Sequence, residues 1–345
     1  GDSVGPAGII RALATLPYYV EFAEAIKKYC PNAWVINYTN PMTMCVQVMY
    51  RVFPQIKAFG CCHEVFGTQK LIAAMVQDAK GIEHVDRSEI KVNVQGINHF
   101  TWLNEISYKG EDLMPMYREF AQKYAETGYT GGKDDNWMNN SFACANMVKF
   151  DLFNRYGVVA AAGDRHLAEF CPPWYLKNPE TVKAWKFGLT TVSYRKEDLK
   201  KRLARSARLV SGEEQMELKT TGEEGVLQMK ALMGMTTLVT NVNIPNYGQI
   251  PNLPLGAVVE TNAVFSHNSL KPVFAGPMNQ SVLPLVSRHC ENQRLVVDAV
   301  INKDLSLAFK AFCNDPLMTA NRTDAKALFD EMVNNTKKYL GWFGL

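Results

Sequence analysis

Apolar and polar residues alternate with two different periods along the first hundred residues. Stretches with helical spacing of apolar residues lie at 18–30, 42–53 and 65–80, and short β-rich runs lie at 33–37 and 56–60. Short strands separated by helices are typical of βαβ units and a parallel sheet. Strict alternation at 90–95 predicts one more strand, buried on one face. Residues 2–10 contain glycine and proline and are expected to form a loop.

Beyond about residue 110 the pattern is mostly helical. Helices are expected at 113–126, 136–156, 195–212, 222–235, 281–302 and 323–340, and strands at 157–161, 237–244 and 257–265. The predicted fold class is therefore α/β. Residues 1–85 resemble the C-terminal part of a Rossmann-like dinucleotide-binding domain, and 86–345 a larger α+β domain. No GxGxxG motif follows a predicted strand, and no P-loop is present.

Composition narrows the class of protein. Of the 345 residues 47% are hydrophobic and 21% charged, as in ordinary globular proteins, and the net charge of +3 does not favour nucleic acid or a membrane surface as partner. The longest uncharged run, 231–259, contains prolines and asparagines and is not expected to cross a bilayer. The 8 cysteines form no CxxC pair, so free thiols and a cytoplasmic location are expected.

Three polar clusters follow predicted strands, at 37–41, 60–64 and 96–100. Ligands bind at such strand ends in open parallel sheets. Cys62 stands before a predicted helix, whose first amides favour the thiolate. Together with His99 it would supply half of a divalent transition-metal site. Simpler interpretations stay open: Asn-Pro as an ordinary turn, the cysteines as small buried side chains, and His99 as a structural residue.

Two further clusters carry candidate chemistry. Residues 163–169 combine Asp164, Arg165 and His166, although an exposed helix start with Asp164 as N-cap would also explain them. The amide-rich segment 241–248 suits a neutral hydroxylated ligand, and equally a buried loop.

Six motifs in order carry a family resemblance. They read GDSVGPAGIIRAL, VINYTNPM, GCCHEVFGTQK, GINHFTW, AAGDRHLAEF and VNIPNYGQIPNLP. In this order they resemble glycoside hydrolase family 4, the glycosidases that use NAD and a divalent metal, and are most similar to its α-galacturonidase group. The resemblance implies a second domain like that of lactate and malate dehydrogenases, and an N-terminal Rossmann half that is missing from this chain.

The resemblance also implies roles for individual residues. Cys62 and His99 match the metal ligands, with Mn²⁺ the usual ion, and His63 matches the catalytic acid. Asn40 matches a position that contacts the sugar hydroxyls and the cofactor, and Asp164 is expected to be the proton acceptor. The implied reaction is oxidation at C3 by NAD⁺, deprotonation at C2, elimination of the C1 oxygen and addition of water, an exception among glycosidases.

The expected substrate is an α-galacturonide, whose carboxylate requires a cationic partner. Arg165 and His166 are the candidates, unless Arg165 instead pairs with Glu169 one helical turn later. Many members have arginine at the position of Ala14, so this chain must do without that arginine or use Arg11. The alternatives are an α-galactosidase or α-glucuronidase, a malate-type dehydrogenase, and an inert truncated fragment. A homo-oligomer is expected, because missing strands would leave a sheet edge and apolar faces uncovered.

Overall fold

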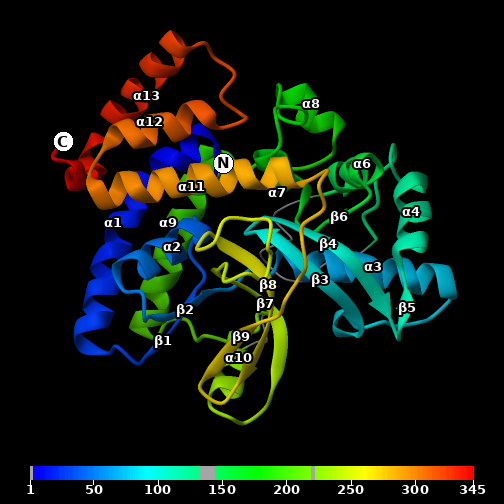
Figure 1. Ribbon diagram of the computed structural model, residues 1–345. Coiled ribbons are helices and arrows are strands. Elements are labelled where there is room, and N and C mark those ends of the chain that lie inside the picture. Colours follow the sequence, from blue (N-terminus) through cyan, green and yellow to red (C-terminus); the bar gives the residue numbers. More distant parts are fainter. Residues whose placement is uncertain (1–2, 132–143, 219–221) are drawn as a thin grey trace.

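Two β-sheets with helices around them form the chain, which confirms the predicted α/β class (Figure 1). The computed structural model describes residues 3–131, 144–218 and 222–345. The first sheet has the strand order β1-β2-β7-β8-β9. Its strands are β1 (Trp34–Asn37), β2 (Lys57–Gly60), β7 (Leu238–Pro245), β8 (Val258–Ser266) and β9 (Ser269–Pro272). Among these strands β1 and β2 pair in parallel, as predicted, whereas β7 pairs antiparallel with β2, β8 with β7, and β9 with β8.

The second sheet is antiparallel. It consists of β3 (Ile90–Ile97), β4 (Phe100–Tyr108), β5 (Glu111–Asp112) and β6 (Val159–Ala160), and both β5 and β6 pair with β4. Strand β8 joins the two sheets, since the Asn262 side chain donates to the carbonyl of Val92 at 2.7 Å. The first sheet thus takes strands from both sides of the boundary predicted at residue 85, and that boundary stays a prediction.

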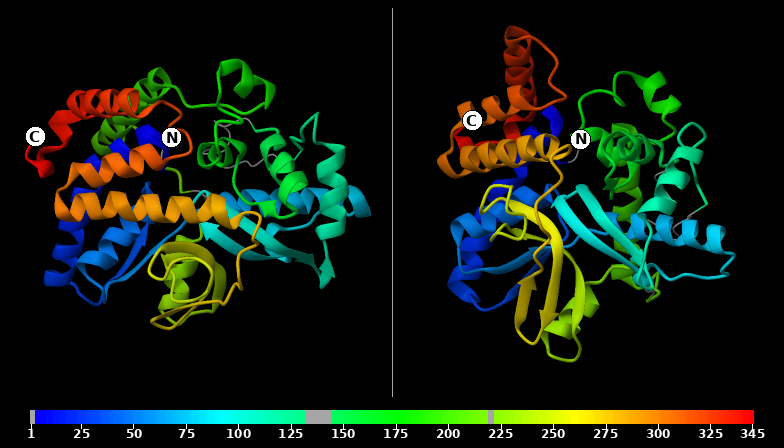
Figure 2. Two further views of the ribbon diagram at one scale, coloured as in Figure 1. Left: turned by 45° about the horizontal axis from the view of Figure 1, so that its top comes forward. Right: turned by 45° about the vertical axis from the view of Figure 1, so that its right-hand side comes forward.

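Helices surround both sheets. They are α1 (Gly5–Tyr29), α2 (Met42–Val52), α3 (Glu64–Lys80), α4 (Met114–Lys123), α6 (Met147–Tyr156), α7 (Asp164–Phe170), α8 (Pro179–Ala184), α9 (Val192–Ser211), α10 (Gly225–Leu232), α11 (Leu283–Asn302), α12 (Leu305–Asn314) and α13 (Arg322–Thr336). The predicted helix at 136–156 is seen from Met147 onward, and its residues 136–143 lie outside the described part of the chain. In all three views α11 (orange) runs from α1 toward the second sheet (Figures 1 and 2).

The loop predicted at 2–10 is wrong, because α1 already begins at Gly5. Pro6 suits the first turn of a helix, where its missing N–H is not needed. The Gly5 amide donates to the Asp315 carboxylate at 2.9 Å, a cap supplied from the other end of the chain. Glycine and proline therefore mark a helix start here, and the stabilising partner is invisible in the local sequence.

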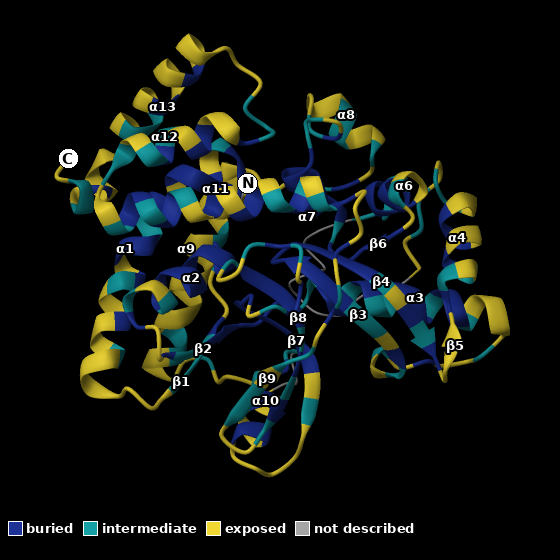
Figure 3. Cartoon of the chain, in the orientation of Figure 1, coloured by how far each residue is buried: buried dark blue, intermediate teal, exposed yellow. Residues whose placement is uncertain are grey.

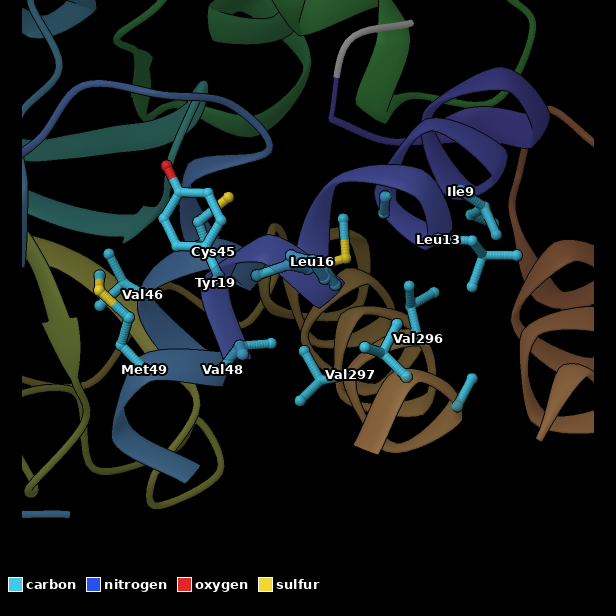
Figure 4. Close-up of a cluster of buried hydrophobic side chains, with 14 of the residues drawn as sticks. Ile9, Leu13, Leu16, Tyr19, Cys45, Val46, Val48, Met49, Val296 and Val297 are labelled. Carbon is cyan, nitrogen blue, oxygen red and sulfur yellow. The ribbon is translucent and has the colours of Figure 1, made fainter. Parts of the chain in front are cut away.

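The largest core lies between α1, α2, α11 and α12 (Figure 4). Leu13, Leu16, Val48 and Val297 are fully buried in it. Burial is densest along these helix faces and on the two sheets, whereas α9 and α13 are largely exposed (Figure 3). Among the described residues no helix has both the length and the apolarity that a membrane crossing needs.

Candidate active site

The first two strand-end motifs lie side by side because β1 and β2 are parallel and in register. Asn37 pairs with Gly60, and the Cys61 amide donates to the Asn37 carbonyl at 3.0 Å. The Asn37 side chain organises the turn, accepting from the Tyr19 hydroxyl at 2.7 Å. Asn40, the predicted sugar and cofactor contact, is half-buried, and its Oδ1 accepts from the Met42 amide at 3.2 Å at the start of α2.

The third motif forms a two-residue hairpin turn. Ile97 pairs with Phe100, so Asn98 and His99 make the whole connection between β3 and β4. His99 has φ of 65°, a left-handed conformation that is uncommon outside glycine and tends to persist where surrounding structure enforces it, as at functional sites. The imidazole is thereby fixed in a buried position.

Residues 163–166 lie beside the hairpin turn at His99, because they follow β6, which pairs with β4. Because Ala160 pairs with Trp102 and the Ala161 amide donates to the Thr101 carbonyl at 2.8 Å, the following turn runs beside the hairpin. As a result the rings of His99 and His166 stack at 3.9 Å between centroids. Two motifs that lie far apart in the sequence thus meet in one cluster.

Glu64 links the motifs at the centre of this cluster. Its Oε2 accepts from the Gly163 amide at 2.6 Å, and its Oε1 lies 3.5 Å from His166 Nε2 and 4.0 Å from His63 Nε2. Burial raises the pKa of Glu64, but His166, the other two histidines and the Gly163 amide together lower it to about 2. Sequence reasoning gave Glu64 no role, although its place directly after His63 was a usable signal.

His63, the predicted catalytic acid, is at the edge of the cluster. Its Nδ1 lies 3.1 Å from the Glu223 carboxylate just before α10, and 17% of its side chain is exposed. The ring is therefore positioned by acidic groups on two sides, Glu64 and Glu223, yet reachable from solvent.

The donor set at Cys62 and His99 fits a divalent ion. Burial and the neighbouring His166 lower the pKa of His99 to about 3, so the ring is neutral, and its Nδ1 is buried without a hydrogen-bond partner among the described residues. A buried neutral imidazole and a cysteine thiolate are ligand types that divalent transition-metal ions accept. No group of three or more His, Cys, Asp or Glu residues suited to a metal occurs in the described ranges.

The predicted effect of the α3 amides on Cys62 is too weak to dominate. Burial raises the pKa of the thiol well above its ordinary value, and the carboxylates of Glu260 and Glu64 add to the rise. The backbone at Glu64 and the Asn98 amide act in the opposite direction without reversing it. Cys62 is thus a thiol in the metal-free chain, and a bound cation would be needed to stabilise the thiolate.

A second buried acid, Glu260 on β8, was missed by the sequence analysis. Burial raises its pKa to about 7, although the nearby side-chain amides of Asn243, Asn241 and Asn98 oppose the rise. Asn241 Nδ2 donates to Glu260 Oε1 at 2.6 Å and to the Cys62 carbonyl at 3.2 Å. A single charged residue inside an otherwise uncharged predicted strand was the signal that the sequence offered.

The amide-rich segment divides into two parts. Asn241 joins the cluster at Cys62, whereas Asn246 holds its own loop, donating to the carbonyls of Ile250 at 2.9 Å and Leu253 at 3.0 Å. The second part therefore matches the simpler interpretation, a buried loop.

Asp164, the predicted proton acceptor, is neither exposed nor an N-cap of its own helix. Its side chain has 0% exposure, and its two oxygens accept from the amides of Val148 and Lys149, each at 3.2 Å, at the start of α6. Burial raises its pKa to about 6, against the opposing effects of Lys149 and these amides. The geometry favours capping of α6 over the predicted role as base.

Arg165 is half-buried beside the cluster. Its Nη1 donates to the Thr190 hydroxyl at 2.8 Å, and the charges of Glu169 and Glu64 act on the guanidinium. His166 faces Glu169 as well, with 3.5 Å between Nδ1 and Oε1. The structure therefore brings His63, His99, Arg165 and His166 to one place around the carboxylates of Glu64 and Glu169.

Comparison with known proteins identifies the family of this chain. Residues 1–78 match the family described as family 4 glycosyl hydrolase, and residues 94–318 match the family 4 glycosyl hydrolase C-terminal domain. The chain belongs to glycosyl hydrolase family 4, and is therefore a glycoside hydrolase rather than a malate-type dehydrogenase. It is 63% identical over 344 residues to an alpha-galacturonidase of Thermoanaerobacterium saccharolyticum, covering 99% of this chain and 74% of that relative.

Solved structures show the same fold. The crystal structure of the lplD protein of Bacillus subtilis, described as a glucosidase, superposes with a TM-score of 0.90 at 52% identity, covering 96% of this chain and 75% of that one. A 6-phospho-alpha-glucosidase from gut microorganisms, solved with NAD and Mn²⁺, has a TM-score of 0.76 at 20% identity, covering 98% of this chain and 74% of that one. This chain thus spans about three quarters of the length of these proteins.

Proposed function

We propose that this chain is an α-galacturonidase that requires NAD and a divalent ion, Mn²⁺ by preference. The observation that carries the proposal is the 63% identity, over 99% of the chain, to a relative named alpha-galacturonidase. The gathering of Cys62, His63 and His99 around Glu64 supports it, because these are the residues on which the family motifs converge.

Cys62 and His99 would hold the ion, and Asn40 would face the sugar and the cofactor. When bound, the ion supplies Lewis-acid polarisation of sugar oxygens and NAD⁺ supplies the hydride acceptor. The protein's own part is to keep these ligands in a buried, water-poor environment, since Cys62 and His99 are both less than a tenth exposed. Low exposure strengthens every electrostatic interaction with the substrate.

His63 is proposed as the proton donor to the leaving oxygen at C1. Glu223 fixes one ring nitrogen, and the position of Glu64 on the other side restricts rotation of the ring. A positioned histidine that is partly open to solvent can deliver a proton and be protonated again from water.

Replacement of Asp164 tests which group accepts the proton from C2. If Asp164 were the base, Asp164→Asn would abolish exchange of the C2 proton with heavy water while the protein stays folded. If Asp164 only caps α6, exchange per folded molecule persists and the melting temperature falls. The full burial of its carboxylate supports the second result.

The uronate preference is proposed to rest on Arg165, with His166 beside it. A guanidinium that is partly desolvated forms strong, bidentate bonds with a carboxylate, which a hydroxymethyl group cannot replace. The alternative partner foreseen for Arg165, Glu169, also acts on its charge. We therefore propose that Glu169 and the carboxylate of the substrate compete for Arg165.

The decisive experiment compares matched α-galacturonides and α-galactosides in heavy water with NAD⁺ and Mn²⁺ supplied. We expect faster cleavage of the galacturonide and deuterium at C2 of the released sugar. Faster cleavage of the neutral sugar would refute the uronate preference, and a C2 position without deuterium would refute the elimination mechanism. Omission of Mn²⁺, with a chelator present, is the control for metal dependence.

Three further properties are proposed together with the function: a domain boundary, a cellular location and an oligomeric state. We propose a domain boundary at 85/86, which is supported by the position of β1 and β2 before it and of every strand of the second sheet after it. A cytoplasmic location is supported by the 8 cysteines, none of which forms a disulfide. A homo-oligomer is supported by large apolar side chains that stay exposed on α9 and α10, such as Leu203 and Met229.

A further inference from the structure

Cys62 lies in a short connection between a strand and a helix. Strand β2 ends at Gly60 and α3 begins at Glu64, so Cys62 belongs to neither element. Bonds to the neighbouring strands orient the chain here instead. The Cys61 amide donates to the Asn37 carbonyl of β1 at 3.0 Å, and the Cys62 carbonyl accepts from the Asn241 side chain of β7 at 3.2 Å. The backbone at Cys62 is therefore held by contacts on both sides of β2.

The same Asn241 amide group also binds an acid. Its Nδ2 donates to Glu260 Oε1 of β8 at 2.6 Å. An amide nitrogen carries two hydrogens, so it can serve the carboxylate and the Cys62 carbonyl at once. Asn241, Glu260 and Cys62 are all less than a tenth exposed, which favours a bridge with little competition from water. Glu260 thus holds Asn241 in the orientation that reaches the Cys62 carbonyl.

The register of the strands explains why the bridge forms at this place. Gly60 of β2 is the partner of Asn243, and Asn243 is the partner of Glu260, so the three residues form a row across the sheet. Continuing the antiparallel register by two residues brings Cys62 opposite Asn241. A Cβ at Gly60 would lie 3.0 Å from the Cβ of Asn243, so the glycine allows β7 to approach this closely.

We propose that Asn241 and Glu260 are positioning residues for Cys62, and that they hold its backbone in the orientation in which the thiolate binds a divalent cation. The inference rests on the proposed function, in which Cys62 and His99 hold the ion. Metal sites require accurate placement of their ligands, and residues that orient a ligand commonly account for about 10- to 100-fold in affinity. The two residues come from strands that the sequence places far from Cys62.

The test titrates Mn²⁺ and Co²⁺ into the wild type, Asn241→Leu, Glu260→Leu and Glu260→Gln. Electron paramagnetic resonance measures Mn²⁺ affinity, and the near-ultraviolet absorption of thiolate-bound Co²⁺ reports the bond between the ion and sulfur. In Asn241→Leu and Glu260→Leu we expect Mn²⁺ affinity to fall about 10- to 100-fold and the absorption per bound Co²⁺ to weaken. Glu260→Gln keeps an acceptor for Asn241 and should retain most of the affinity and of the absorption.

Asn252→Leu is the matched control. The Asn252 side chain donates to the Met278 carbonyl at 2.8 Å, so the variant also loses an amide bridge between two segments, and it should bind both ions as the wild type does. The double variant Asn241→Leu/Glu260→Leu should lose no more affinity than Asn241→Leu, because the two residues form one linkage. Affinities are compared per folded molecule, from thermal unfolding of each variant. Asn241→Ser, with one donor in place of two, takes the place of Asn241→Leu if the latter does not fold.

The outcomes separate this inference from the proposed function. Equal Mn²⁺ binding by Cys62→Ser and the wild type overturns the proposed metal site and the inference with it. Binding that depends on Cys62 but is unchanged in the Asn241 variants overturns the positioning role alone. A Glu260→Gln variant as weak as Glu260→Leu overturns it too, since the carboxylate itself would then serve the ion. A loss of the same size in Asn252→Leu would reduce the effect to general stability and also overturn the role.

Discussion

The imidazole rings of His99 and His166 stack with 3.9 Å between their centroids and 27° between their planes. His166 in turn lies 3.5 Å from both Glu64 and Glu169. The hairpin turn fixes the backbone of His99. Its ring is in addition packed against His166, which the two carboxylates hold in place. This arrangement makes His166 a positioning residue for the proposed metal ligand.

Replacing His166 should therefore weaken metal binding without removing a ligand. For His166→Ala we expect Mn²⁺ affinity to fall about 10- to 100-fold, the range for residues that orient ligands. His166→Phe keeps the stacked ring and should lose less. Titration of Mn²⁺ followed by electron paramagnetic resonance measures both. Equal affinity in His166→Ala and the wild type would show that the stack does not orient His99.

The two adjacent cysteines offer a matched pair of variants. Cys62→Ser should abolish tight Mn²⁺ binding, because a serine hydroxyl stays protonated and is a poor ligand at neutral pH. Cys61→Ser should bind Mn²⁺ as the wild type does, since the Cys61 thiol instead lies 2.9 Å from the Gln228 amide oxygen. Isothermal titration of both variants decides the assignment, and a similar loss in both would contradict it.

Glu64→Gln tests the residue that connects the motifs. The Glu64 carboxylate accepts a hydrogen bond from the Gly163 amide and lies 3.5 Å from His166. We therefore expect the free energy of unfolding of the variant to be lower by about 1–3 kcal/mol at neutral pH. Folding lowers the pKa of Glu64 from 4.5 to about 2. Its contribution to the free energy of unfolding is therefore fully present above pH 4.5 and is lost as the pH falls toward 2. Urea denaturation against pH measures this, with Glu83→Gln, an exposed acid, as control. Indistinguishable curves for Glu64→Gln and the wild type would refute the connecting role.

Asp164 should produce the opposite pH dependence. Folding raises its pKa from 3.8 to about 6, so the folded chain binds this proton more tightly and its contribution to stability declines as the pH rises through that interval. Asp164→Asn should lack this decline and lose about 0.5–2 kcal/mol of the capping interaction with α6. Thermal unfolding between these pH values is the measurement. A decline that persists in the variant would have to come from another group.

His63→Ala should reveal a proton donor through its dependence on the leaving group. Substrates with poor leaving groups should lose about 10²- to 10⁴-fold in kcat, and activated aryl substrates much less. The exposed His84 provides the control, since His84→Ala removes an imidazole that lies outside the six motifs. A uniform loss across all leaving groups would assign His63 to binding rather than to proton transfer.

Helices and strands could be predicted from the sequence where the local spacing of apolar residues determines them. The helical spacing at 42–53 became α2, and the alternation at 90–95 became β3, antiparallel to β4. Such periodicities reflect which face of an element is buried, and this is recorded residue by residue in the chain. The six motifs, taken in order, likewise led to the family.

The tertiary structure decided what depends on partners distant in the sequence. The start of α1 rests on Asp315 and the burial of Asp164 on the first turn of α6, while burial and the charge of Glu260 in β8 raise the pKa of Cys62. Each case joins groups that are separated along the chain, and charge and desolvation depend on distance in space rather than on sequence spacing. The sequence by itself therefore determined the fold class and the motif residues. Only the packing of α7, α9 and the two sheets determined how these residues are charged and which of them face one another.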